Sequence, residues 1–190
     1  VRNWPEARRV AIRLAVDSPQ GVALYFGGDH IQLFNEATLP SLGGRQAEVF
    51  ARPYAVSYPQ LVGYMLPVLA AAYAGERTYH PAALVPFERN GRLEDVWFDL
   101  SYTPIRDTSG AVIGVYQAFL ERTDEVLNAR RLTTVNRLAR TPVSRSRHDA
   151  ISAVLTCLAE AADLPFAVVY LVDTGGVRAT LAGASGVPEG

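Results

Sequence analysis

The chain has 190 residues, of which 49% are apolar and 19% charged, and its formal net charge is -1. This composition is typical of a folded protein with a buried core, and the near-zero charge gives no overall attraction to nucleic acid or to an anionic membrane. No apolar run reaches the ~20 residues that a membrane-spanning helix needs. The single cysteine, Cys157, excludes an internal disulfide framework and fits a reducing compartment, so we expect a cytoplasmic protein without a membrane span.

The sequence contains no lysine, since all 18 basic residues are arginine. This excludes three kinds of site at once: the lysine of a phosphate-binding P-loop, a Schiff-base lysine and a lysine general base. Histidine, cysteine and acidic residues form no cluster with metal-ligand spacing. Residues 183–186 (GASG) lack the Gly-x-Ser-x-Gly spacing of a nucleophile elbow. We therefore predict no catalytic residue and no metal site in this chain.

Residues 1–20 are predicted to contain an amphipathic helix that flanks the main domain. Its apolar side chains recur three and four positions apart, and they are Ala7, Val10, Ala11 and Leu14. Two short strands follow in residues 22–35, joined by a glycine turn into a hairpin. Asn35 stands where a side-chain cap is needed for the short helix predicted over residues 36–42.

A longer helix is predicted over residues 59–74, after an irregular stretch at residues 45–57. Pro67 is expected to distort this helix locally, and Gly75 closes it. Its apolar side chains fall on one face at helical spacing. They are Leu61, Tyr64, Met65, Val68, Leu69 and Ala72.

Residues 84–125 carry the pattern around which the chain is organised, in which two turns join three strands of alternating character. Asn90-Gly91 suits a two-residue hairpin because both residues accept positive φ, and residues 107–110 (DTSG) form the second turn. One set of alternating side chains between the turns is apolar, and a slip of one residue would expose it. That set is Val96, Phe98, Leu100 and Tyr102.

The last third of the chain is predicted to contain a helix and an unfinished second domain. Residues 124–147 include six arginines, which we interpret as a solvated helix face or partner contact, because no aromatic residues interleave with them as single-strand binding favours. Residues 148–190 predict one helix and two strands, too few elements to bury a core. Cys157 lies among apolar residues of that helix and is interpreted as a buried small hydrophobe, in preference to a redox sensor.

Three local sequences resemble elements of the PAS sensory fold. LFNEA at residues 33–37 resembles the end of its second strand, and SYTPIRDTSGAVIGV at residues 101–115 resembles its last hairpin. LERTDEV at residues 120–126 resembles the acidic-Thr element that precedes its exit helix. The tail, DLPFAVVYLVD followed by ATLAGASGVPEG, resembles the first helix and strands of a GAF domain. These two modules in this order imply the N-terminal sensory region of a bacterial sensor histidine kinase.

The resemblance implies an α+β fold, with a PAS-like five-stranded antiparallel sheet, helices on one face, an exit helix and an incomplete GAF-like α/β segment. The implied parts are a flanking helix at residues 1–20, a PAS-like domain at 21–123, a linker or signalling helix at 124–147 and an incomplete GAF-like domain at 148–190. The implied partners are a second copy bound through the exit helix and a downstream kinase or output domain. No nucleic acid partner is expected.

The resemblance does not identify a ligand, and the cofactor is unknown. Flavin-binding PAS proteins with a reactive cysteine carry an Asn-Cys-Arg motif that is absent here, and haem-binding relatives supply a histidine from the long helix, which contains none. His30 and His80 are interpreted as surface or satisfied residues. PAS domains place their ligands between sheet and helices, and six side chains are candidates for a small-molecule pocket there, although plain core packing is the favoured interpretation of them. They are Tyr25, Phe34, Met65, Leu69, Phe98 and Tyr102.

Signal transmission is expected at the joint between the last strand and the exit helix, at Glu121, Thr123, Asp124 and Glu125. Two other functions stay open: an interaction module whose cup is filled by its own side chains, and an enzyme that uses a polar pair such as His80 and Asp99. His148-Asp149 has the form of a kinase phosphoacceptor. No second long helix or ATP-binding glycine motif follows it, so we interpret His148 as a helix-start residue.

Overall fold

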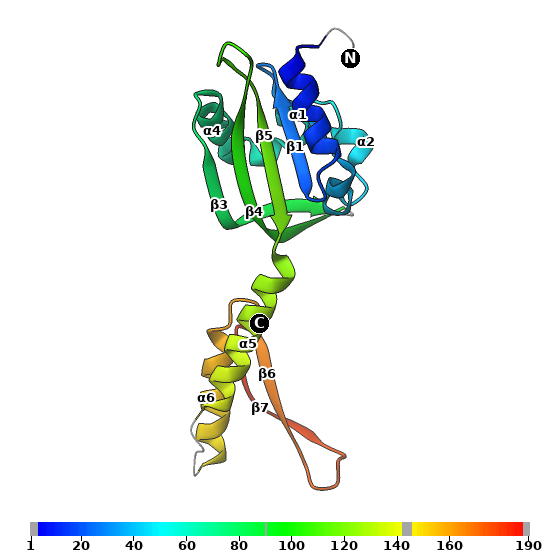
Figure 1. The fold of residues 1–190 in the computed structure, drawn as a ribbon. Helices are drawn as coiled ribbons and strands as arrows, with labels where there is room; N and C mark the ends of the chain where they lie inside the picture. The colour runs from blue at the N-terminus through cyan, green and yellow to red at the C-terminus, as the bar shows by residue number, and fades with distance from the viewer. Residues whose placement is uncertain (1–3, 90, 142–145, 188–190) are drawn as a thin grey trace. The chain divides into compact units, whose positions relative to one another are not determined.

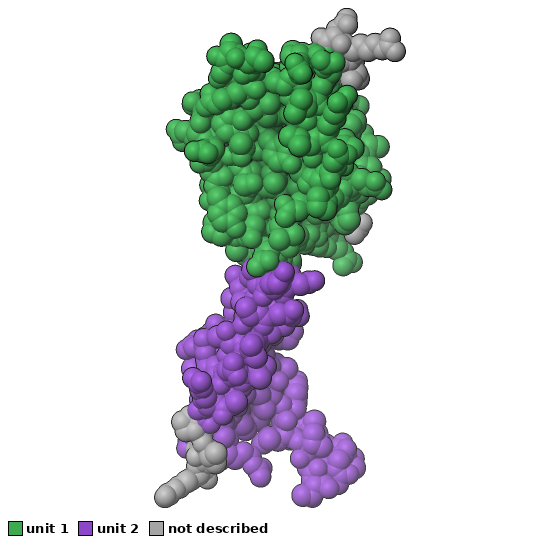
Figure 2. Space-filling model, viewed as in Figure 1, with its two compact units in different colours: residues 1–123 green, residues 124–190 purple. Residues whose placement is uncertain are grey.

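The computed structural model describes residues 4–89, 91–141 and 146–187 (Figure 1). The chain divides into two compact units, residues 1–123 and residues 124–190 (Figure 2), and each is described by itself. No helix in the described ranges is long and apolar enough to cross a membrane.

The first unit is built on one five-stranded antiparallel sheet, which confirms that part of the predicted fold. The strand order is β2-β1-β5-β4-β3. The strands are β1 (Gly21–Phe26), β2 (Ile31–Phe34), β3 (Thr78–Arg89), β4 (Arg92–Arg106) and β5 (Val112–Glu121). The first hairpin pairs β1 with β2 and the predicted meander pairs β3, β4 and β5 in sequence, whereas the contact of β1 with β5 joins the two ends of the domain.

The two turns of the meander have the chemistry that their residues predict. Arg89 pairs with Arg92, so the first connection has two residues, of which Asn90 lies outside the described residues and Gly91 has a φ of 73°. In the second turn the Asp107 carboxylate accepts hydrogen bonds from the Ser109 hydroxyl and from backbone N–H groups. Both turns therefore hold the strands in the register that places the apolar set on one face.

The inner face of the sheet is covered by a run of short helices and one longer helix (Figure 1). They are η1 (Glu36–Leu42), α2 (Gln46–Val49), α3 (Tyr54–Ser57), η2 (Pro59–Leu61) and α4 (Val62–Tyr73). Met65, Leu69 and Ala72 of α4 are buried, and they pack with the inward side chains of β4, where Val96, Phe98, Leu100 and Tyr102 all belong to one core cluster. The predicted apolar face of the meander is therefore the core face.

Helix α1 (Glu6–Val16), the predicted flanking helix, covers the opposite face of the sheet, whereas the helices within residues 21–123 lie on the inner face (Figure 1). The predicted apolar stripe of α1 is partly wrong, since Ala11 and Ala15 are buried while Val10 and Leu14 are 47% and 61% exposed. Small alanine side chains let the helix backbone approach β1, whose own large side chains fill this second core.

Asn35 does not cap η1 with its side chain as predicted, and joins three segments instead. Its side-chain oxygen accepts a hydrogen bond from the Val22 backbone N–H at 3.0 Å. Its side-chain nitrogen donates to the carbonyl oxygens of Ala15 and Gln20 at 2.9 and 2.8 Å. Asn35 is only 5% exposed, so this one amide satisfies buried backbone groups where α1 ends and β1 begins.

The second unit consists of two helices and a hairpin, in the positions that the sequence predicts. The elements are α5 (Thr123–Ala139), whose first residue closes the first unit, α6 (Arg147–Ala159), β6 (Ala167–Val172) and β7 (Ala179–Ser185). Cys157 is buried in α6, as predicted. Two arginines of the basic segment bind acids of this unit, Arg130 to Asp163 at 3.0 Å and Arg137 to Glu160 at 2.7 Å, which favours the helix-face interpretation of that segment.

Candidate ligand cavity and transmission network

A cavity of about 70 Å³ lies between the inner face of the sheet and the helices of the first unit. Four of the six predicted pocket residues line it: Tyr25, Met65, Phe98 and Tyr102. They come from β1, α4 and β4, so elements far apart in the sequence meet at this point. The predicted ligand position and a cavity therefore coincide in this structure.

The other two predicted pocket residues do not line the cavity. Leu69 is fully buried in the core cluster, one helical turn beyond Met65 on α4. Phe34 ends the edge strand β2, where its ring packs against Phe50 with centroids 5.1 Å apart. Periodicity assigns a residue to the inward face but does not say how far along that face it lies.

A chain of hydrogen bonds spans the cavity lining. The Tyr25 hydroxyl donates to the Gln117 side-chain oxygen at 2.6 Å, and the Gln117 nitrogen donates to the Tyr102 hydroxyl at 3.0 Å. The Tyr102 hydroxyl in turn donates to the sulfur of Met65 at 3.4 Å. Gln117 is a polar residue between the inward apolar residues Val115 and Phe119 of β5, a signal by which the sequence could have revealed it.

The aromatic lining is electrically neutral at physiological pH. Burial raises the pKa of Tyr25 well above its ordinary value, and it raises the pKa of Tyr54 and Tyr102 in the same direction. Burial also raises the pKa of Tyr58 to about 12, although the nearby Arg45 charge lowers it. Tyr54 belongs to the stretch predicted as irregular, and Tyr58 lies between that stretch and the predicted helix, so the local pattern did not reveal their place in the lining.

The pair suggested for an enzyme, His80 and Asp99, is not brought together. His80 pairs with Leu100 across the sheet, so it shares the inward face and lies beside the Tyr102 ring, with centroids 5.9 Å apart. Asp99 is the next residue along β4 and projects to the other face. There it accepts a hydrogen bond from the Ala82 backbone N–H and lies 3.7 Å from the Arg122 guanidinium.

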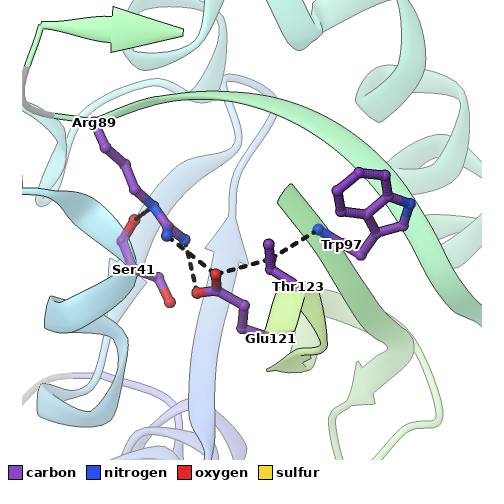
Figure 3. Close-up of polar contacts among 5 residues, drawn as sticks. All are labelled: Ser41, Arg89, Trp97, Glu121 and Thr123. Carbon is purple, nitrogen blue, oxygen red and sulfur yellow. Dashed lines mark hydrogen bonds and ion pairs between the residues drawn. The ribbon is translucent and has the colours of Figure 1, made fainter. Parts of the chain in front are cut away.

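A second polar cluster, which we call the transmission network, joins β3, β5 and the start of α5 (Figure 3). Arg89 donates two hydrogen bonds to the Glu121 carboxylate, at 3.1 and 2.7 Å. The Thr123 hydroxyl donates to the same carboxylate at 2.9 Å and accepts from the Trp97 backbone N–H at 3.2 Å. Arg89 also donates to the Ser41 carbonyl oxygen at 3.1 Å.

Glu121 is held in its charged form by this network. Partial burial by itself would raise the pKa of Glu121, but hydrogen bonds from Arg89 and Thr123 and the charge of Arg89 outweigh it, so the pKa is lowered. Of the four predicted transmission residues, Glu121 and Thr123 belong to the network. Asp124 and Glu125 are exposed in the first turn of α5, where the helix dipole stabilises negatively charged side chains. Arg89 and Ser41 were missed because they are far from Glu121 in sequence.

The cavity and the transmission network share Ser41 and lie next to each other at two phenylalanines. Ser41 lines the cavity and its carbonyl oxygen accepts from Arg89. Phe87 also lines the cavity, and the Arg89 guanidinium carbon lies 5.8 Å from the centre of its ring. Phe119, two residues before Glu121 on β5, is a third lining residue. Residues of the cavity lining therefore contact Arg89, which binds Glu121.

Comparison with protein families identifies the first unit. A family model described as the PAS fold matches residues 19–127, more than half of the chain. The chain belongs to the PAS fold family. The match covers the cavity and the transmission network, and it ends within α5. No curated protein matches the chain.

Solved structures of PAS relatives have the same fold. The Rhodobacter sphaeroides LOV protein is 12% identical, with a TM-score of 0.50 over 84% of this chain and 94% of that one. An RNA-binding Light-Oxygen-Voltage receptor is 19% identical, also with a TM-score of 0.50, over 72% of this chain and 39% of that one. The chain thus spans well under half of the length of that receptor. At these identities the likeness concerns the fold alone.

Proposed function

We propose that this chain is a non-catalytic sensory input segment, in which the PAS domain binds a small molecule and passes the change to α5 through the transmission network. The observation that carries the proposal is the sharing of Ser41 and Phe87 between the cavity lining and the surroundings of Arg89. A ligand that displaces either residue alters the position of the Arg89 guanidinium. Glu121 and Thr123 then transfer that change to the first turn of α5.

We further propose a cytoplasmic parent protein, a sensor histidine kinase, in which residues 148–190 begin a GAF domain. Support comes from the sequence resemblance and from the order helix, strand, strand in the second unit. A homodimer through α5 belongs to the same proposal, because Leu132 and Val135 are 61% and 59% exposed and lie three positions apart on one side of the helix.

A second candidate function is an interaction module without a ligand. One observation favours it, because a cavity of about 70 Å³ is small beside the roughly 300–1,000 Å³ of ordinary ligand sites. In that case the tyrosine side chains themselves fill most of the space between the sheet and the helices, and the outer surface of the domain binds the partner.

The two functions are separated by native mass spectrometry of the full-length protein combined with hydrogen exchange. The sensory proposal expects a retained or added small molecule, together with changed exchange of the α5 backbone amides on binding. The Glu121→Gln variant should bind the same molecule without that change in exchange. Equal responses of α5 in both proteins would overturn transmission through the network.

A further inference from the structure

One lining residue carries a buried oxygen that the protein itself leaves without a partner. Gln32 lies directly opposite Tyr25 in the β1–β2 pair, so both side chains project to the inner face, and both line the cavity. Gln32 is 5% exposed, and no group in the described part of the chain donates a hydrogen bond to its side-chain oxygen. A buried amide oxygen without a donor destabilises the fold by roughly 1–3 kcal/mol, unless a bound molecule donates a hydrogen bond to it.

Two buried tyrosines of the same lining carry phenol groups. Tyr54 and Tyr58 line the cavity together with Gln32, and they are 5% and 3% exposed. Each hydroxyl can donate to an acceptor inside the cavity. The polar groups of the lining therefore include an acceptor on Gln32 and donors on Tyr54 and Tyr58.

The lining also lacks charge. The residues that line the cavity are aromatic, aliphatic, hydroxyl and amide types, and none of those described is Asp, Glu, Arg or His. An ionised ligand would lose its hydration there without gaining an ion partner among the lining residues, which is costly. The volume of about 70 Å³ corresponds to about five water-sized spheres, and an apolar cavity of about 150 Å³ is known to bind benzene.

We propose that the cavity selects a neutral ligand of about four to six non-hydrogen atoms that donates a hydrogen bond to Gln32 and accepts one from Tyr54 or Tyr58. This inference rests on the proposed function, because it names the ligand class of the same cavity. Small amides and azoles that carry a donor beside an acceptor have this chemistry. Carboxylates and ammonium ions of the same size are rejected.

Two matched probe pairs test the proposal on the chain of 190 residues by NMR titration. Pyrazole and isoxazole are five-membered rings of the same size, of which only pyrazole has an N–H donor. Acetamide and acetate have the same shape, and only acetate is charged. We expect dissociation constants of roughly 0.1–10 mM for pyrazole and acetamide, because the affinity available per atom limits such small ligands. Isoxazole should bind at least about fivefold more weakly than pyrazole, and acetate should not bind.

The Gln32→Met variant keeps the length of the side chain and removes its acceptor. It should melt no lower than the natural chain, because the unpartnered oxygen is gone, and it should bind pyrazole and isoxazole equally. The control is Gln60→Met, at an exposed residue of η2. It should change neither the preference for pyrazole over isoxazole nor that for acetamide over acetate.

Three results would overturn the ligand class: equal binding of pyrazole and isoxazole by the natural chain, binding of acetate as tight as that of acetamide, or no binding of any probe. These results are separate from the proposed function, which is measured at the amides of α5. Pyrazole binding at the cavity that leaves α5 exchange unchanged would contradict transmission while supporting the ligand class.

Discussion

Replacing Glu121 with glutamine should destabilise the first unit by about 2 kcal/mol. Hydrogen bonds to charged groups contribute about 1.5–3 kcal/mol, and breaking a fully buried ion pair costs about 3–5 kcal/mol, whereas exposed pairs contribute less than about 1 kcal/mol. The Arg89 side chain is 15% exposed and that of Glu121 is 32% exposed. The Arg89–Glu121 pair therefore lies between a fully buried and an exposed ion pair. Most of the destabilisation comes from leaving the Arg89 cation without its carboxylate.

Urea unfolding followed by tryptophan fluorescence measures the change in unfolding free energy of the first compact unit. Both tryptophans of the chain, Trp4 and Trp97, belong to residues 1–123. A double-mutant cycle with Arg89→Met and Glu121→Gln should give a coupling free energy of about 1–2 kcal/mol. Arg92→Met is the control, because Arg92 is an exposed residue of the same hairpin and should change stability by less than about 0.5 kcal/mol.

The reasoning is refuted if Glu121→Gln costs no more than Arg92→Met, or if the cycle shows no coupling beyond about 0.3 kcal/mol. Either result would mean that the carboxylate does not anchor the end of β5. Hydrogen exchange at the start of α5 should report the same loss, with faster exchange in both single variants than in the control.

Three further perturbations have defined outcomes. Because the folded-state pKa of Glu121 is lowered, its stabilising contribution is present above the ordinary value of 4.5 and is lost as the pH falls through the folded-state pKa; the difference in unfolding free energy from the glutamine variant should shrink over that acid range. Asn35→Ala should cost about 1–3 kcal/mol in urea unfolding, because the buried Val22 N–H loses its acceptor. Gly114→Ala should cost about 1–3 kcal/mol, since its new methyl carbon would lie 2.6 Å from an aromatic ring of β1, whereas Gly63→Ala in α4 meets no neighbour and should leave the melting temperature unchanged or higher.

Much of the architecture is readable from local patterns. The alternation that includes Phe98 and Tyr102 predicted the buried face of β4, and the turn at residues 107–110 predicted the β4–β5 hairpin. These predictions succeed because the inward or outward direction of a strand side chain and the geometry of a turn depend on neighbours in sequence. The family resemblance predicted a ligand pocket between sheet and helices, and four of the six residues named for it line the cavity.

The three-dimensional partners could not be read in this way. Arg89 and Glu121 lie 32 residues apart and meet only because β3 and β5 flank β4 in the sheet. Gln32 faces the cavity because β2 adds to the edge of β1, and β1 reaches β5 from the other end of the domain. Nothing in the local sequence records these long-range pairings.

The sequence by itself therefore determined which side chains face inward and where the last strand passes into the exit helix. Tertiary structure alone decided that α1 covers the outer face, since the small side chains of Ala11 and Ala15 matter only where a sheet lies beneath them. It also decided the volume of the cavity and which polar atoms in it lack partners. Both properties result from the packing of many side chains together, so no local pattern in the sequence sets them.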